Sequence, residues 1–374
     1  MSAVGIGVIG AGVISDTYLE NLASFPDVEV LIVGDIDTAR AAAQAAKHGV
    51  PAHGDVAAVL AHDGVQIVVN LTIPAVHLEI SRQAIAAGKH VWTEKPLGLD
   101  RDEAAALLRE AAAAGLRVGS APDTLLGPGF QSARRAIEDG RIGRPLFAQT
   151  AFQTQGPDLW HPNPAFLFAD GAGPLLDMGP YYVSALVSIL GPVDRVAAIG
   201  SKAQQTRTVH TGPQAGTSFD VEVPSTVQFI TAFDSGAQAQ SLLSFDSALE
   251  RHGVVEIHGT EGTIVLPDPN QFSGRIAVIE PLGVLRDGMT HDQVWQEIPH
   301  PDIAVGRGLG VLDMARAISE GRPHIASGEL GYHVLDTLLT TAESVTTGQS
   351  LAVTSTVSPV PLLPDDFDPF RATL

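Results

Sequence analysis

The chain has 374 residues and a mass of 39.0 kDa, which suits two domains of ordinary size. Hydrophobic residues make up 45% of the sequence and charged residues 17%, a composition that argues against a disordered chain. There are 22 Lys and Arg residues against 42 Asp and Glu residues. The resulting formal net charge of -20 repels nucleic acid and acidic lipid headgroups.

The sequence contains no cysteine, which excludes disulfides, thiolate zinc sites and thiol nucleophiles, and which fits a cytoplasmic location. No uninterrupted apolar run approaches the ~20 residues that a membrane span needs. We therefore expect a folded, cytoplasmic protein that acts on a small molecule and binds neither nucleic acid nor a membrane.

Short β-branched runs alternate with Ala-rich helical stretches over residues 1–124, a pattern typical of parallel βαβ units. Strands are expected at Val4 to Ile9, Val28 to Gly34, Ile67 to Leu71, His90 to Thr93 and Arg117 to Ser120, with a weaker one near Ala52. Helices are expected at Leu78 to Ala87 and Asp102 to Ala114. Because the strands are almost wholly apolar, the pattern predicts a doubly wound α/β sheet of the Rossmann type.

Residues 125–374 follow a different pattern, which predicts a second domain of the α+β class with a mostly antiparallel sheet. Alternating runs without crossover helices are found at Thr226 to Phe233, Ala237 to Phe245 and Gly253 to His258, and residues 259–262 have hairpin turn chemistry. Helices are expected at Phe130 to Glu138, Leu175 to Leu190 and Leu309 to Ser319. We expect a loop or hairpin excursion over residues 202–224, and a Pro-rich C-terminal segment, residues 358–374, that is held against the fold.

A glycine-rich turn follows the first strand and predicts a dinucleotide site. Gly5 and Gly7 have suitable spacing but fall inside the strand, whereas Gly10 and Gly12 stand where the strand ends and a helix begins. The N–H groups at the start of that helix, near Val13 and Ile14, would then face the diphosphate.

An acidic residue ends the second strand, where a ribose-binding carboxylate belongs. A carboxylate at Asp35 would accept hydrogen bonds from the ribose hydroxyls and repel a 2'-phosphate, which favours NAD over NADP. Arg40 stands one helical turn further on and weakens that preference. Asp37 is expected to cap the helix that begins at Thr38.

The sequence Glu94-Lys95-Pro96 follows the strand at His90 to Thr93, at the edge of the sheet where such folds bind ligands. An ammonium at Lys95 could donate to a substrate hydroxyl or carbonyl and stabilise negative charge on that oxygen as hydride moves. The alternative is a strand-end lysine that pairs with Glu94.

Five motifs follow one another along the chain: the glycine turn, Thr72-Ile73-Pro74-Ala75-Val76-His77, Ala87-Gly88-Lys89-His90-Val91, Glu94-Lys95-Pro96 and Gly171-Ala172-Gly173-Pro174-Leu175-Leu176-Asp177-Met178-Gly179. In this order and spacing they resemble the glucose-fructose oxidoreductase, inositol dehydrogenase and rhizopine catabolism (Gfo/Idh/MocA) family. The resemblance implies a nicotinamide-dependent oxidoreductase of sugars or polyols, with Lys95 catalytic. We also expect cofactor contacts from Thr72, Pro74, His77, Glu94 and Lys95. The resemblance also implies a large open sheet in the second domain, used to form a homodimer or homotetramer.

One position departs from the family pattern, which has an Asp followed four residues later by a His. Here Asp177 is followed at that distance by Tyr181. A phenol, with a reference pKa near ~10, is a poor base near neutral pH unless a cation stabilises its anion. The proton could be handled by Tyr181 beside Lys95, by His161 from another segment, or by Lys95 and Asp177 alone.

Other residues are candidates for substrate contacts. Trp160 and His161 lie in a Pro-rich loop that could form a platform for a sugar, or Trp160 could belong to the core. Asp123 follows the last Rossmann strand and could bind a substrate hydroxyl or cap the next helix. His77 could contact the cofactor or orient the helix that follows it, and the histidines show no metal-binding spacing.

These observations together predict an NAD-dependent oxidoreductase that acts on a secondary hydroxyl, or the matching ketone, of a sugar, cyclic polyol or sugar derivative. One alternative is a regulatory protein that senses the dinucleotide or a sugar without turnover. Another is a reductase of an imine or a carbon-carbon double bond.

Overall fold

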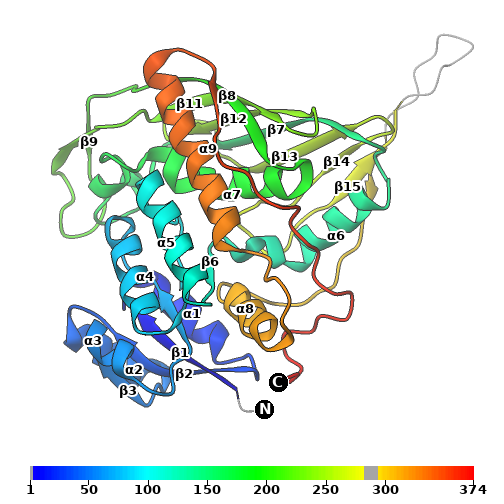
Figure 1. Cartoon of the computed structure of the whole chain (residues 1–374). Helices are drawn as coiled ribbons and strands as arrows, with labels where there is room; N and C mark the ends of the chain where they lie inside the picture. The colour runs from blue at the N-terminus through cyan, green and yellow to red at the C-terminus, as the bar shows by residue number, and fades with distance from the viewer. Residues whose placement is uncertain (1–2, 282–293) are drawn as a thin grey trace, which may run out of the picture. The chain divides into compact units, whose positions relative to one another are not determined.

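The computed structural model describes residues 3–281 and 294–374. The chain forms two compact units (Figure 1). Unit 1 comprises Met1–Gly127, Ile303–Leu335 and Val360–Leu374, and unit 2 comprises Pro128–Asp302 and Asp336–Pro359. Unit 1 therefore includes two segments from the C-terminal part of the chain. The sequence pattern had placed all of residues 125–374 in the second domain.

A six-stranded parallel sheet forms the centre of unit 1, as predicted, with the strand order β3-β2-β1-β4-β5-β6. Its strands are β1 (Val4–Ile9), β2 (Val28–Gly34), β3 (Ala52–Gly54), β4 (Ile67–Asn70), β5 (His90–Thr93) and β6 (Val118–Ser120). The strand order reverses between β1 and β4, and in open α/β sheets ligands bind at the carboxyl ends of the strands beside this point.

The crossovers of unit 1 are helices with well-formed ends. They are α1 (Val13–Leu22), α2 (Thr38–His48), α3 (Val56–Ala61), η1 (Pro74–Val76), α4 (His77–Ala86), α5 (Arg101–Ala113) and η2 (Asp123–Leu126). Asp37 accepts hydrogen bonds from the N–H groups of Ala39 and Arg40 and so caps α2, as expected. Gly115 follows α5 with a φ of 69°, a left-handed conformation that glycine adopts without strain.

The C-terminal segments of unit 1 are held by a buried ion pair. Arg316, in α8 (Leu309–Glu320), donates from Nε to Asp27 Oδ2 at 2.8 Å. The same carboxylate accepts the N–H groups of Thr373 and Leu374, at 2.9 and 3.1 Å to Oδ1. The expectation that the Pro-rich end is held down is thereby confirmed, and these contacts explain why α8 belongs to unit 1.

Unit 2 is built on a nine-stranded sheet with the order β16-β15-β14-β13-β7-β12-β11-β8-β17. Its strands are β7 (Pro145–Gln153), β8 (Val193–Ser201), β11 (Thr226–Phe233), β12 (Gln238–Ser244), β13 (Arg251–Gly259), β14 (Thr263–Val265), β15 (Ala277–Ile279), β16 (Gln296–Glu297) and β17 (Leu351–Ala352). Only β7 and β12 pair in parallel among these strands, so the prediction of a mostly antiparallel sheet is confirmed.

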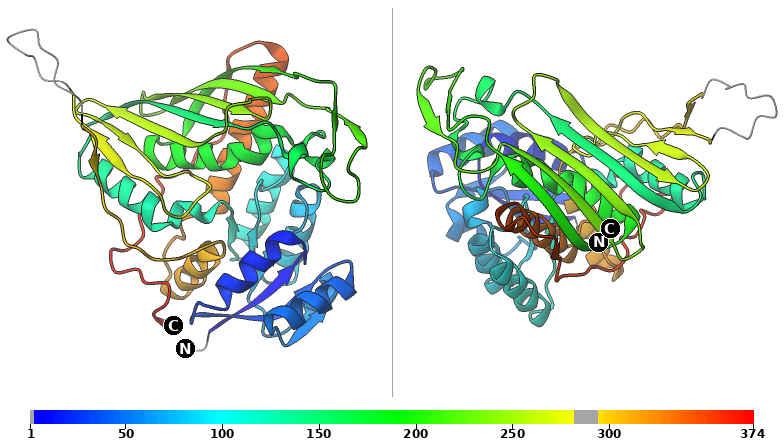
Figure 2. Two further views of the ribbon diagram at one scale, coloured as in Figure 1. Left: turned by 180° about the vertical axis from the view of Figure 1, so that it is seen from behind. Right: turned by 90° about the horizontal axis from the view of Figure 1, so that it is seen from above.

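Helices cover one face of this sheet and leave the other open (Figure 2). The helical elements are α6 (Pro128–Glu138), η3 (Pro157–Leu159), η4 (Ala165–Leu167), α7 (Gly173–Leu190) and α9 (Gly328–Thr347), whose C-terminal part belongs to unit 2. The expected excursion at residues 202–224 contains a two-stranded ribbon of β9 (Thr206–Thr208) and β10 (Ser218–Asp220). Within the described ranges, no helix combines the length and apolarity that a membrane crossing requires.

Candidate active site

The turn after β1 requires glycine for two different reasons. Gly10 has a φ of 105°, and a Cβ at this position would lie 2.6 Å from the Leu71 carbonyl oxygen. Its N–H donates to the Gly34 oxygen at 2.8 Å, so the turn is packed between the ends of β2 and β4. A Cβ at Gly12, in contrast, would meet no atom within 4 Å. The close turn and the open approach are the two features that a diphosphate loop needs.

The first turn of α1 can receive an anion. Gly12 occupies the N-cap position, and no side-chain hydrogen bond caps the helix. Val13 is 92% exposed and Ile14 is half-buried, so neither side chain closes the site. Unpaired backbone N–H groups and the positive end of the helix dipole therefore remain at this point, and they fit the diphosphate of a dinucleotide.

Asp35 joins the glycine turn to α2. Its Oδ2 accepts the Ala11 N–H at 2.7 Å, and its Oδ1 accepts the Asp37 N–H at 2.8 Å. Arg40 Nη2 lies 3.0 Å from Oδ1. Burial favours the neutral acid, but these hydrogen bonds and the Arg40 guanidinium outweigh it and lower the pKa of Asp35 below its ordinary value. The carboxylate is thus ionised and able to accept further hydrogen bonds from a ribose.

Apolar side chains project from the same edge of the sheet. Ile36, after β2, is 94% exposed, and Ile73, after β4, is 66% exposed. Isolated exposed apolar residues are common, but these two and Val13 all stand at the carboxyl ends of β1, β2 and β4. They fit the apolar faces of a dinucleotide that runs from the glycine turn along this edge.

The loop after β4 is held by a buried polar network. Asn70 Oδ1 accepts the Thr72 hydroxyl at 2.6 Å, and Asn70 Nδ2 donates to the His77 carbonyl oxygen at 3.0 Å. Pro74 begins η1 and makes no polar contact through its side chain. Thr72 and Pro74 therefore lie on a firmly held turn at the sheet edge, and their cofactor contact stays a prediction.

His77 is turned into the fold of unit 1. Its side chain is buried, with Nδ1 2.7 Å from the Pro96 oxygen and Nε2 2.9 Å from the Thr72 oxygen. Burial lowers the pKa of His77, although the carbonyls favour its charged form. His77 thus connects the turn after β4 to the Lys95-Pro96 segment and orients both, as the second alternative requires, and its contact with the cofactor stays a prediction.

The Glu94-Lys95-Pro96 segment begins directly after β5, and its Lys95–Pro96 peptide bond is cis. Glu94 is buried and accepts hydrogen bonds from the Tyr18 hydroxyl at 2.8 Å and from the Lys95 N–H at 3.0 Å. Lys95 itself is half-buried. The Glu94 carboxylate thus fixes the backbone on which the candidate catalytic lysine is mounted, and its own contact with the cofactor stays a prediction.

Tyr18 was not singled out by the sequence pattern. It is fully buried, accepts the Trp92 indole N–H at 3.2 Å and donates to Glu94. Burial, with Glu94 and Asp123 nearby, raises the pKa of Tyr18 well above its ordinary value. The phenol is therefore a permanent donor, and a tyrosine in a helix of this composition carries no local signal of that role.

Asp123 is a helix cap and is not exposed to a ligand. The carboxylate is fully buried, and its Oδ2 accepts the N–H groups of Gly308 and Gly310 at 2.7 and 3.1 Å. Burial raises its pKa to about 6. The suggested substrate contact is therefore replaced by the capping alternative, although the capped helix is α8 and not the helix that follows in sequence.

In unit 2, the structure places Asp177 and Tyr181 one turn apart on α7, which continues through Pro180. Asp177 is half-buried, and Tyr181 is only 4% exposed. Tyr182 is fully buried, and its hydroxyl accepts the Gly253 N–H at 3.0 Å. Tyr182 is thus a core residue, and its hydroxyl is engaged by the backbone of β13.

Trp160 and His161 lie on the surface of unit 2. Trp160 is 67% exposed, so the core alternative for its side chain is wrong. His161 packs edge-on between Trp160 and Phe166, with ring centroids 5.6 and 5.3 Å away. The Asn163 N–H donates to His161 Nδ1 at 3.0 Å, so the neutral ring carries its proton on Nε2. The side chains form an exposed aromatic cluster suited to stacking.

Within the described residues, no group of three or more His, Cys, Asp or Glu side chains is arranged to hold a metal ion. The predicted cofactor residues of unit 1 follow the carboxyl ends of β1, β2, β4 and β5, at one edge of its sheet. The predicted residues of unit 2 divide between α7 and the loop at residues 157–168.

Comparisons with known proteins agree with this geometry. A family model described as an oxidoreductase family with an NAD-binding Rossmann fold matches residues 4–121, and the C-terminal domain model of the GFO/IDH/MocA family matches residues 130–265. Trans-1,2-dihydrobenzene-1,2-diol dehydrogenase of Bos taurus is 27% identical over 266 residues, 70% of this chain and 74% of that protein.

A second relative, 1,5-anhydro-D-fructose reductase of Ensifer adhaerens, is 28% identical over 268 residues, 69% of this chain and 74% of that protein. The structure of a levoglucosan dehydrogenase in complex with NADH superposes with a TM-score of 0.81. That match covers 94% of this chain and 100% of the other at 21% identity, and so shows the shared fold. The chain therefore belongs to the Gfo/Idh/MocA family of NAD-binding oxidoreductases.

Proposed function

We propose that the protein transfers a hydride between NAD and a secondary hydroxyl, or the matching ketone, of a sugar, cyclic polyol or sugar derivative. The observation that carries the proposal is the edge of the unit 1 sheet, where the open Gly12 position, the ionised Asp35 and Lys95 follow β1, β2 and β5. The names of the two relatives, a dihydrodiol dehydrogenase and an anhydrofructose reductase, support a substrate with hydroxyl or keto groups on a ring.

NAD, when bound, supplies the hydride acceptor. We assign the diphosphate to the N-terminus of α1 and the adenosine ribose to Asp35. Lys95 would donate to the substrate oxygen and stabilise negative charge there as the C–H bond breaks. Asp177 would accept a hydrogen bond from the substrate and orient it, since it is half-buried on α7.

For the proton on the substrate hydroxyl, we propose Tyr181 as the acceptor. Its burial raises the cost of a phenolate, so the role depends on a cation, which Lys95 would provide. His161 is a weaker candidate because its Nδ1 lone pair already accepts the Asn163 N–H. The remaining nitrogen of a neutral ring is then a donor and cannot take a proton.

The direct test is a screen of sugars, inositols and dihydrodiols with NAD, in which the absorbance of the reduced nicotinamide reports turnover. With an active substrate, Lys95→Met should lower kcat by a factor of ~100 or more and leave NAD affinity within about threefold. Lys47→Met is the matched control, because Lys47 is an exposed lysine that pairs with Asp16. Unchanged turnover in Lys95→Met would remove this residue from the mechanism.

The same screen separates the enzyme from a sensor. A protein that binds NAD and a sugar, but reduces no NAD with any of these compounds, would favour the regulatory alternative. If the protein instead oxidises NADH with an imine or a carbon-carbon double bond as the acceptor, it is a reductase of that bond.

We further propose that the protein forms a homodimer or homotetramer through the open face of the unit 2 sheet. Large apolar side chains are exposed on its strands, including Phe147, Ile199 and Ile230. Phe147 also stacks on His258, with ring centroids 4.2 Å apart. Sedimentation should give an oligomer for the wild type and a smaller species for Ile199→Asp/Ile230→Asp, whereas a monomeric wild type would reject the proposal.

A further inference from the structure

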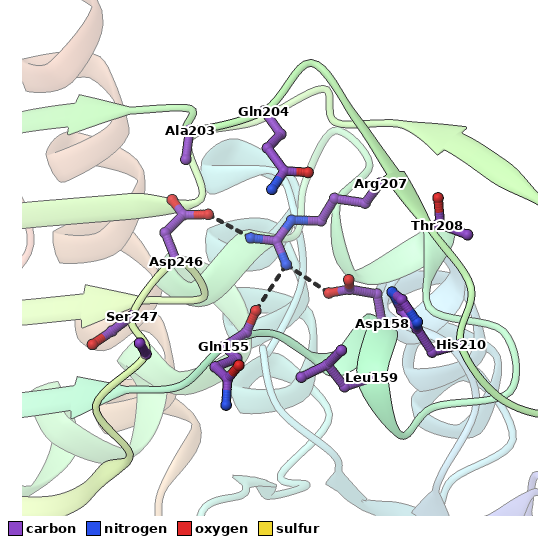
Figure 3. Close-up of a pocket in the computed structure, with 11 residues that line it drawn as sticks. Gln155, Asp158, Leu159, Ala203, Gln204, Arg207, Thr208, His210, Asp246 and Ser247 are labelled. Carbon is purple, nitrogen blue, oxygen red and sulfur yellow. Dashed lines mark hydrogen bonds and ion pairs between the residues drawn. The ribbon is translucent and has the colours of Figure 1, made fainter.

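A polar pocket opens on unit 2, and its lining includes no residue assigned above to hydride or proton transfer. Its volume is about 470 Å³, within the range of small-molecule sites. We call it the Arg207 pocket after the buried side chain in its wall (Figure 3). Its lining comes from the loop after β7, the excursion that contains β9 and the segment after β12, and it includes neither Asp177 nor Tyr181.

The pocket is held in shape by Arg207. Its Nη1 donates to the Gln155 oxygen at 2.9 Å and to Asp158 Oδ1 at 2.6 Å. Its Nη2 donates to the Phe245 oxygen at 2.8 Å and to Asp246 Oδ1. One guanidinium thus joins three segments that are far apart in sequence, so the pocket exists before a ligand arrives.

Arg207 and its two carboxylate partners, Asp158 and Asp246, form a clamp that further contacts make rigid. The guanidinium lies over the Phe168 ring, 4.9 Å from its centroid. Asp246 Oδ2 accepts the hydroxyls of Ser225 and Thr226 at 2.6 and 2.9 Å. Arg207 and Asp158 are both buried, so their charges interact with each other and are not exposed to a ligand.

The charges around the pocket select against anions. Two carboxylates, Asp158 and Asp246, face a single guanidinium, so the three groups together have a formal charge of -1. The Arg207 Nε is buried and has no hydrogen-bond partner, so it is not available at the surface to a phosphate or carboxylate. An anionic ligand would meet repulsion without a cation to bind it.

The most accessible side chains of the lining are polar and carry no formal charge. Gln204 and His210 are exposed and Thr208 is half-buried, and none of their side chains hydrogen-bonds to the part of the chain that the structure describes. Amide, imidazole and hydroxyl groups each donate and accept, which matches the paired donors and acceptors of ring hydroxyls. Leu159 adds an apolar wall, and the exposed Trp160 follows it in sequence.

We propose that the Arg207 pocket binds an uncharged, polyhydroxylated ring of the sugar or glycoside class. The choice of substrate class rests on the proposed function. The preformed clamp, its excess negative charge and the neutral polar lining carry the assignment, and they exclude sugar phosphates and uronic acids from this subsite.

The test measures binding without turnover. Lys95→Met is titrated in the absence of NAD with cellobiose, D-glucose and glucose 6-phosphate, by ligand-observed NMR and calorimetry. We expect saturable binding of a neutral sugar and weaker binding of the phosphate. Adding Gln204→Ala/His210→Ala to Lys95→Met should lower the affinity for the neutral sugar about tenfold, which is the loss expected for two hydrogen bonds.

A matched double variant, Gln205→Ala/His53→Ala, provides the control. Both residues are exposed, and neither lines the pocket. Added to Lys95→Met, the control pair should leave the affinity for the neutral sugar unchanged. Absence of saturable binding of any neutral sugar, equal binding of the phosphate, or equal losses in the two double variants would each overturn the proposal.

The outcome is independent of the proposed function. If the wild type oxidises sugars but Lys95→Met/Gln204→Ala/His210→Ala binds cellobiose as tightly as Lys95→Met does, only the pocket assignment fails. If binding follows the pocket variants but no sugar reduces NAD, only the dehydrogenase assignment fails.

Discussion

Arg40 Nη2 lies 3.0 Å from Asp35 Oδ1, so the carboxylate expected to hold the ribose is already paired with a cation. Arg40 is half-exposed, whereas Asp35 is buried against the glycine turn. In the proposed site, this negative and positive group would stand side by side where NAD and NADP differ. Asp35 is the better placed of the two, because its Oδ2 is fixed by the Ala11 N–H.

Asp35→Ser should therefore weaken the binding of NAD and allow NADP to bind. Loss of the carboxylate removes two charge-assisted hydrogen bonds to the ribose and frees Arg40 for a 2'-phosphate. We expect the ratio of kcat/KM for NAD to that for NADP to fall by a factor of ~100 or more. Asp37→Asn is the control, because Asp37 only caps α2; it should change stability by about 1 kcal/mol or less and leave the ratio intact.

Tyr181→Phe tests the proton acceptor through the pH dependence of kcat/KM. If the phenol takes the proton, kcat should fall by ~10² to 10⁴ and the ionisation that limits the rate should disappear from the profile. Tyr182→Phe should leave the profile unaltered, since Tyr182 only accepts the Gly253 N–H in the core. An unaltered profile in Tyr181→Phe, combined with a changed profile in His161→Ala, would transfer the role to His161.

Asp123 predicts a specific pH dependence of stability. Burial raises the pKa of its carboxyl from an ordinary 3.8 to about 6. The stability that the protonated form contributes is complete below pH 3.8 and is lost as pH rises to about 6. The loss should approach ~3 kcal/mol, given 1.36 kcal/mol per pKa unit.

Asp123→Asn removes this titration. Urea unfolding of the wild type and the variant, compared from pH 4 to pH 7, should show the variant gaining relative to the wild type across that interval. A difference that does not change with pH would mean that Asp123 is not protonated in the folded protein.

The ion pair between Arg316 and Asp27 should control the stability of unit 1. Arg316→Leu leaves Asp27 buried without a cation and also removes the donors to the Asp368 and Arg371 carbonyl oxygens. We expect a loss of about 3 to 5 kcal/mol in the free energy of unfolding. Arg275→Leu breaks an exposed pair with Glu297 and should change it by less than about 1 kcal/mol. Equal effects would contradict the importance of the buried pair.

Much of unit 1 follows from local sequence pattern. The strands predicted at Val4 to Ile9, Val28 to Gly34 and His90 to Thr93 have those bounds in the structure. Fully buried strands are recognisable because nearly every residue must be apolar. The glycine turn is recognisable for a similar reason, since its backbone conformation excludes other residues at Gly10.

Local sequence pattern did not predict the elements whose stability comes from tertiary packing. No helix was expected at Gly328–Thr347, because Thr and Gly residues lower its intrinsic helix propensity. In the structure Leu335, Thr337, Leu338 and Thr341 are buried, so tertiary contacts stabilise the helix. Likewise β7 and β8 were missed, and β7 is the central strand that joins both halves of the unit 2 sheet.

The sequence by itself determined the Rossmann strands, the glycine turn and the candidates Asp35, Lys95, Asp177 and Tyr181, because each depends on a short motif or a local period. Only the tertiary structure decided that Asp123 caps a helix 185 residues away and that His77 faces inward. It also decided that Arg207 joins three distant segments into a pocket. Such roles depend on which partner a side chain meets after folding, and no local pattern specifies a partner far along the chain.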